Sequence, residues 1–182
     1  MKPEIPCLSA GRGVSKTRSA GLMWPKPAAN GPRVCAISAV TAILRGGLNE
    51  GDAAGSALFE ATELLLDQIE AQEIWPALYV RWELGLLSAL GFGLDLDECA
   101  LSGANDGLTH VSPKTGRAVR GSEAEEYVDR LLRLPQFLVE STAHVAPADI
   151  ADGLKLTGYF LEERLFGGLN RGVPPERMRL VG

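Results

Sequence analysis

The chain has 182 residues, of which 46% are hydrophobic, so it is long enough to bury the core of one domain. No apolar run approaches the roughly 18 residues of a membrane-spanning helix, so we expect no membrane segment. The net charge of −5 argues against a surface devoted wholly to phosphate, although local basic patches can still bind it. The three cysteines, Cys7, Cys35 and Cys99, are odd in number and far apart, which indicates a reducing compartment and a cytoplasmic protein.

Residues 1–31 look unlike a folded unit. Gly, Pro, Ser, Lys and Arg dominate this segment, and no helical or strand period persists in it. It carries five cationic side chains against one carboxylate, a net charge of +4, and its large apolar side chains cluster at Leu22, Met23 and Trp24. We predict a flexible, disordered basic arm over residues 1–31, followed by a folded helical domain over residues 32–182.

Helical periodicity begins at Pro32 and predicts two helices before residue 71. The first helix stops at Gly46-Gly47, and its inner side is predicted to carry Ile37, Val40, Thr41 and Leu44. The second begins between Asp52 and Ser56, and its inner stripe is predicted to be Leu58, Thr62, Leu65 and Ile69. Short connections predict that these helices are antiparallel neighbours of the helix that follows.

The helix expected from Pro76 to Leu90 organises the rest of the chain. Proline suits the first helical position, where its missing N–H removes no helical hydrogen bond. Apolar residues such as Trp82 and Leu86 then recur at three- and four-residue steps, so one broad face is apolar. We predict that Gly91 ends the helix in a left-handed conformation and that Phe92 folds back onto Leu87, as in a Schellman motif.

The sequence after Cys99 predicts a small β insertion. Two short β-compatible segments flank a turn that contains Pro113 and Gly116, so a β-hairpin is expected at about 109–119. Ser122 and Glu125 form a capping-box pattern, which predicts a helix that continues through Leu132.

Pro147 is expected to begin the last long helix, with Ile150, Leu154, Leu161 and Leu165 on its inner side and Gly167-Gly168 at its end. Together these elements predict a mainly α fold. It is a helical bundle of about five helices, with a small β-hairpin insertion and the disordered N-terminal arm.

Enzymatic activity is not expected. His110 and His144 belong to separate elements, and neither lies in a local pattern that supplies a nucleophile, a base and an orienting group. The Gly-Phe-Gly sequence at 91–93 follows a helix, whereas a phosphate-binding glycine loop precedes one.

Four sequence signatures occur in order between residues 33 and 181: LGFGLDLDECALSG, HVSPKTGRAV, LTGYFLEERLF and PPERMRLV. In this order they resemble the C-terminal helical region of RecO, a family of bacterial DNA repair and recombination mediators. The resemblance implies binding and annealing of single-stranded DNA and contact with the C-terminal tail of the single-stranded-DNA-binding protein. It also implies cooperation with RecR in loading RecA, and a cytoplasmic, nucleoid-associated location.

The chain departs from this family in two respects. RecO-like proteins begin with an OB-fold barrel, and residues 1–31 lack the strands for one, so we expect the OB-fold to be missing. Some members carry zinc on two CxxC pairs, but here Ser102 stands at the second position of the first pair and no cysteine follows Cys99. His110 is the one further plausible ligand nearby, so we expect no metal and no cofactor, with Cys99 a small buried residue.

Two non-enzymatic functions from different classes follow. The first is a nucleic-acid-acting mediator, whose hairpin and tail bind single strands weakly and in a salt-sensitive manner. The residues that carry this prediction are Lys114, Arg117, Arg120, Arg171, Arg177 and Arg179.

The alternative is a helical protein-interaction module, a truncated RecO fragment without intrinsic DNA activity. A groove between its helices would accept an acidic, apolar peptide such as the tail of the single-stranded-DNA-binding protein. We look for this groove first at Tyr79, Arg81 and Trp82, because a guanidinium matches a terminal carboxylate and aromatic side chains supply an apolar socket. Trp82 also fits the core.

Overall fold

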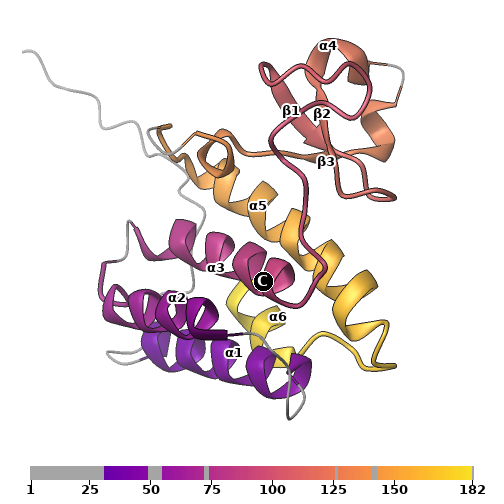
Figure 1. The fold of residues 1–182 in the computed structure, drawn as a ribbon. Coiled ribbons are helices and arrows are strands. Elements are labelled where there is room, and N and C mark those ends of the chain that lie inside the picture. The colour runs from indigo at the N-terminus through magenta and orange to yellow at the C-terminus, as the bar shows by residue number, and fades with distance from the viewer. Residues whose placement is uncertain (1–30, 49–54, 72–73, 126, 141–142, 182) are drawn as a thin grey trace, which may run out of the picture.

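The computed structural model describes residues 31–48, 55–71, 74–125, 127–140 and 143–181. Its helical bundle contains α1 (Gly31–Gly47), α2 (Gly55–Asp67), α3 (Trp75–Ala89), α5 (Pro147–Phe160) and α6 (Pro175–Val181). A small sheet lies to one side of this bundle, inserted between α3 and α5 (Figure 1). The predicted mainly helical fold with a small β insertion is therefore confirmed. Apart from Gly31, the predicted basic arm lies outside the described residues.

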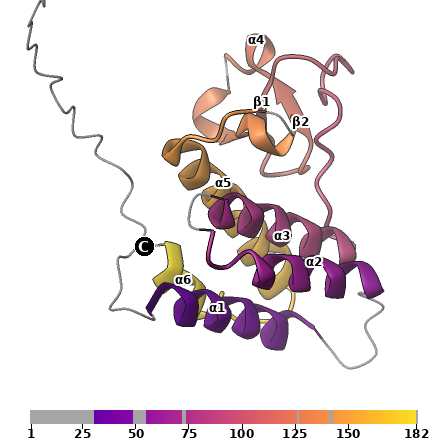
Figure 2. The same cartoon turned by 90° about the vertical axis from the view of Figure 1, so that its left-hand side faces the viewer.

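Helix α3 is the centre of the bundle, as the periodicity predicted. It packs against α2 on one side and α5 on the other, and Figures 1 and 2 show it between them. The Trp75 and Trp82 side chains are buried, and their indole N–H groups donate to the Leu65 carbonyl (3.1 Å) and the Thr62 hydroxyl (3.0 Å) of α2. These bonds satisfy the polar edge of each ring, so both tryptophans can belong to the core.

The predicted Schellman motif ends α3. Gly91 has a φ of +82°, a conformation that glycine adopts without steric strain. The Phe92 N–H donates to the Leu87 carbonyl (2.8 Å), and the Gly91 N–H donates to the Ser88 carbonyl (3.0 Å). Both bonds satisfy carbonyls that the helix leaves without partners, and the chain then turns toward the insertion.

The predicted inner side of α1 is partly wrong. Its buried residues are Ala36, Ala39, Val40 and Ile43, whereas Ile37 is 47% exposed and Thr41 is exposed. Helix α6 is the main neighbour of α1. Small side chains allow two helices to approach closely. The side of α1 that carries Ala36 and Ala39 is therefore buried, although Ile37, on the predicted side, is larger and more apolar.

The insertion is a three-stranded antiparallel sheet with the order β2-β1-β3. The predicted hairpin is present as β1 (Leu108–Val111) and β2 (Ala118–Arg120), in which His110 pairs with Val119. The third strand, β3 (Leu132–Arg133), pairs with the other edge of β1, so that β1 is the central strand.

The helix predicted from Ser122 through Leu132 is wrong. Helix α4 covers Gly121–Ala124, and it is followed by the 3₁₀ turn η1 (Val128–Arg130) and then by β3. Apolar spacing near Leu131 and Leu132 fits either a helix or a strand in so short a run. Pairing with β1 favours the strand, because it satisfies backbone groups of both segments.

The last long helix begins at Pro147 as predicted and continues past α5 as a π-helical segment, η3 (Leu161–Phe166). Between the insertion and α5 lies a second 3₁₀ turn, η2 (Gln136–Leu138), which buries Phe137. No helix among the described residues is long and apolar enough to cross a membrane.

Candidate functional site

A buried ion pair connects α6 with α3. Arg177 is 3% exposed and Glu83 is fully buried. The Arg177 Nε and Nη2 atoms donate to Glu83 Oε1 and Oε2 at 2.7 and 2.9 Å. The Thr157 hydroxyl of α5 donates to Oε2 at 2.5 Å, and Arg177 Nη2 also reaches the Leu154 carbonyl at 2.9 Å. Each charge is thus hydrogen-bonded as well as paired, as burial requires.

The electrostatics of this cluster favour its ionised form. Burial alone lowers the pKa of the Arg177 guanidinium, but the adjacent Glu83 carboxylate outweighs burial and holds that pKa above its usual value. Burial, followed by the Glu83 charge, raises the pKa of the Tyr79 phenol, so this group stays neutral. The Tyr79 hydroxyl is buried and has no hydrogen-bond partner among the described residues.

The prediction that Arg177 contributes to a surface for nucleic acid is wrong. Its guanidinium lies in the core and is bound to Glu83, so it is not presented to a phosphate. The pairing of Arg177 with Glu83 was not predicted from the sequence. A signal was present, because Tyr79, Glu83 and Leu86 follow an i, i+4, i+7 spacing and so place a carboxylate on an apolar stripe.

The three residues predicted for a peptide site do not share a surface. Tyr79 and Trp82 are buried, and their rings stack at 5.8 Å between centroids, with the Trp75 ring stacked on the other side of Tyr79. Arg81 is exposed, donates to the Phe137 carbonyl, and lies over the Phe137 ring. The two aromatic residues therefore stabilise the core, and Arg81 connects α3 to η2.

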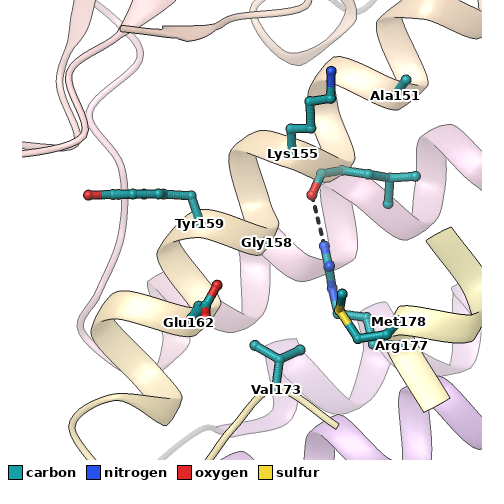
Figure 3. Close-up of a pocket in the computed structure, with 9 residues that line it drawn as sticks. Ala151, Lys155, Gly158, Tyr159, Glu162, Val173, Arg177 and Met178 are labelled. Carbon is teal, nitrogen blue, oxygen red and sulfur yellow. Dashed lines mark hydrogen bonds between the residues drawn. The ribbon is translucent and has the colours of Figure 1, made fainter. Parts of the chain in front are cut away.

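A groove lies between α5 and α6. It has a volume of about 700 Å³, and its walls include Leu154, Val173 and Met178. Figure 3 shows Lys155, Tyr159 and Glu162 along the α5 side, with Val173 and Met178 opposite. Lys155 is exposed on one turn and Glu162 two turns later, so opposite charges flank an apolar floor.

The buried ion pair is next to the groove, because Arg177 also lines it. The Arg177 guanidinium crosses α5 at Gly158, where an added Cβ would lie 3.0 Å from Nη1. This ion pair joins α6 to α3, and α6 supplies one wall of the groove.

The predicted cations of the hairpin mostly have carboxylate partners. Arg117 pairs with Asp95 and Glu98, both at 3.0 Å, and Arg120 pairs with Asp106 at 2.7 Å. Lys114 is exposed in the turn between β1 and β2. The pairs are partly exposed, so each contributes little to stability, but they lower the net positive charge of this surface.

The other two predicted cations of the tail, Arg171 and Arg179, are exposed and lie apart from the hairpin cations in the chain. Arg171 donates to the Gly46 carbonyl at 3.3 Å, which connects the segment before α6 to the end of α1. Arg179 lies 3.7 Å from Glu176 on the same helix.

Cys99 is buried at the base of the hairpin, as predicted. Its thiol donates to Glu123 Oε2 at 3.2 Å, and its sulfur accepts the Arg120 N–H at 3.3 Å. Burial raises the pKa of this thiol, but backbone N–H groups, the Arg120 group first among them, bring that pKa below its usual value. Hydrogen bonds from Ser102 and then from Cys99 lower the pKa of Glu123.

The described side chains around Cys99 offer too few ligands for a structural zinc ion. A structural zinc ion takes four ligands, almost always thiolate, imidazole or carboxylate. In the part of the chain that the structure describes, no group of three or more such side chains could hold a metal ion. The donors around Cys99 instead satisfy one another by hydrogen bonds.

His110 lies in the central strand of the insertion and is mostly buried. Its Nδ1 atom is 2.9 Å from the Thr109 hydroxyl. Burial, followed by the charge of Arg133, lowers the pKa of His110, which favours the neutral ring.

Comparison with known proteins points to one family. A family model described as "Recombination protein O C terminal" matches residues 29–171. The chain is 74% identical over 148 residues to the DNA repair protein RecO of Hyphomonas neptunium, a match that covers 81% of this chain and 61% of that protein. It is 49% identical over 145 residues to RecO of Caulobacter vibrioides, with coverages of 80% and 59%.

A third relative, RecO of Rhodospirillum centenum, is 46% identical over 151 residues. The chain thus spans between 59% and 61% of the length of these three relatives. No solved structure matches the chain.

Proposed function

Because the chain belongs to the RecO family of DNA repair proteins, we propose that it mediates repair and homologous recombination mainly through contacts with other proteins. The observation that carries this proposal is the groove between α5 and α6. Concave, mostly apolar surfaces with a few placed charges are typical binding sites. The proposed role is non-catalytic.

The ligand that fits the groove best is an acidic, apolar peptide, such as the C-terminal tail of the single-stranded-DNA-binding protein. Leu154, Val173 and Met178 can receive its apolar side chains, and the exposed ammonium of Lys155 can pair with its carboxylates. Glu162 repels an acidic segment at the other end. The peptide should therefore bind with its acidic part toward Lys155.

Membership of the family also supports cooperation with RecR in loading RecA, and annealing of single strands, as further proposals. The described surface favours weak DNA binding. Arg117, Arg120 and Arg179 are close to carboxylates, so these three cations offer less net positive charge to phosphate. Binding should rest on exposed cations such as Lys114 and Arg171 and should fall steeply as salt rises.

The test compares two charge reversals on two ligands by fluorescence anisotropy. Lys155→Glu should weaken binding of a labelled tail peptide by about tenfold, because it replaces an exposed attraction of up to about 1 kcal/mol by a repulsion of similar size. Lys114→Glu is the matched control, and it should weaken oligonucleotide binding but not peptide binding. If Lys155→Glu and the parent bind the peptide with equal affinity, the peptide does not bind in this groove.

A Met178→Ser variant tests the apolar wall separately. Met178 is 56% exposed, so its replacement should leave the fold intact. Loss of peptide affinity in both variants would place the peptide in the groove, whereas loss in Lys155→Glu alone would indicate a contact outside it.

A further inference from the structure

Helix α2 carries exposed apolar side chains on its outer side. Phe59 is 64% exposed and Leu64 is 57% exposed, and Leu66 is also exposed. The opposite side of the helix is already used, since Leu58 and Leu65 are buried in the bundle. The exposed apolar residues are therefore additional to those that α2 needs for packing.

The same outer side is acidic. Phe59, Glu63 and Leu66 follow an i, i+4, i+7 spacing and form one row along the helix, and Glu60, Leu64 and Asp67 form a second row. All six side chains are exposed, and we call them the α2 outer face. Helix α2 has no lysine or arginine. A partner for this face needs apolar anchors and several cations.

Residues 1–30 of the same chain have this chemistry. They contain Leu22, Met23 and Trp24, flanked by Lys16, Arg18 and Lys26, and their net charge is +4. The segment has large apolar side chains next to cations, and the α2 outer face has large apolar side chains next to carboxylates. The two surfaces are therefore complementary in both apolar character and charge.

The segment also starts from the right place. It joins α1 at Gly31, and Figures 1 and 2 both draw α1 below α2, on the side away from the inserted sheet. The residues from Trp24 to Gly31 can span up to about 25 Å, and α2 is about 20 Å long. A short tether gives an effective concentration of about millimolar, so modest contacts suffice.

We propose that the segment from Lys16 to Lys26 binds the α2 outer face of its own chain, with Leu22, Met23 and Trp24 against Phe59 and the neighbouring leucines. The cations of the segment then lie against Glu60, Glu63 and Asp67. This binding covers apolar surface that is otherwise exposed, and it holds the cations of the segment away from other anions. It is independent of the groove between α5 and α6.

Trypsin cleavage after Arg18 in the full chain tests this inference, with the product identified by mass. A bound segment should be cut at least about threefold more slowly than a synthetic peptide of residues 1–31, because only the released form is a substrate. The variant Glu60→Gln/Glu63→Gln should be cut faster than the parent, and so should Phe59→Ser. Added salt should also speed cleavage of the parent, because it screens the attraction between the cations of the segment and the carboxylates of the α2 outer face.

The matched control is Glu125→Gln/Asp129→Asn, which removes the same charge from exposed positions in the insertion. It should be cut at the rate of the parent. Equal cleavage rates for the parent, Glu60→Gln/Glu63→Gln and Phe59→Ser would overturn the proposal. Protection that increases with protein concentration would also overturn it, since the segment would then bind a second copy. Circular-dichroism melts check that each variant is folded.

Discussion

Arg177 of α6 and Glu83 of α3 form a two-point ion pair that is buried in the centre of the bundle. Helix α6 packs on α1, and α3 packs on α2 and α5. The pair therefore joins the last helix of the domain, which packs on the first, to the central helix.

Removing one partner of this pair should destabilise the protein strongly. Arg177→Met leaves the Glu83 carboxylate buried without its counter-ion, which should lower the free energy of unfolding by about 3–5 kcal/mol. Urea unfolding followed by circular dichroism measures this change. The double variant Glu83→Leu/Arg177→Met should lose less stability than Arg177→Met alone, because no unpaired charge remains. A single variant as stable as the parent would show that the pair does not hold α6.

Gly158 should resist replacement although it lies inside a helix. Alanine is favoured over glycine there by about 1 kcal/mol in propensity. Its Cβ would lie 3.0 Å from Arg177 Nη1, so the hydrogen-bonded guanidinium must shift by a few tenths of an ångström. We expect Gly158→Ala to lower the free energy of unfolding by about 1–2 kcal/mol.

Gly85 is the matched control for that substitution, because an added Cβ there meets nothing within 4 Å. Gly85→Ala in α3 should raise the stability by about 0.5–1 kcal/mol. Thermal melts of both variants test the comparison, and a stabilising Gly158→Ala would contradict the proposed restriction.

Stability should depend on pH through His110. The pKa of this ring is below its ordinary value of 6.5 in the folded protein. As pH falls below 6.5, the unfolded chain takes up a proton that the folded chain resists, so stability is lost. We expect the melting temperature of the parent to fall more between about pH 7.5 and 5.5 than that of His110→Gln. Equal slopes in the two proteins would show that His110 does not titrate in this way.

Metal removal should leave the fold unchanged. The Cys99 thiol is satisfied by Glu123 and by the Arg120 N–H, so the base of the hairpin has hydrogen bonds where a metal ion would otherwise be needed. Treatment of tag-free protein with a chelator should not shift its melting temperature. One zinc ion per chain, together with a lower melting temperature after chelation, would contradict this expectation.

Much of the fold could be predicted because it follows from local rules. The helix end at Gly91 needs a residue in the left-handed conformation, which glycine adopts readily. The central position of α3 follows from apolar residues that recur at three- and four-residue steps along most of its length. The segment around Leu132 could not be predicted in the same way. Its few apolar residues fit two periods, and pairing with β1, which is distant in sequence, decides between them.

The candidate site was harder to predict because it depends on which residues meet across the bundle. Arg177 is one of several tail arginines in the sequence, and only the packing of α6 brings it to Glu83. Tyr79 and Trp82 have the amphipathic character of binding residues, but the neighbouring helices bury both. The groove itself joins α5 to a segment about twenty residues later, so no local pattern indicates it.

The most direct test of the account measures two ligands on the full chain at two salt concentrations. Fluorescence anisotropy would follow a labelled C-terminal peptide of the single-stranded-DNA-binding protein and a labelled single-stranded oligonucleotide, at low ionic strength and at about 0.15 M. We expect peptide binding to persist at the higher ionic strength, whereas oligonucleotide binding should be weak and largely lost. Tight oligonucleotide binding at about 0.15 M, with no binding of the peptide, would contradict it.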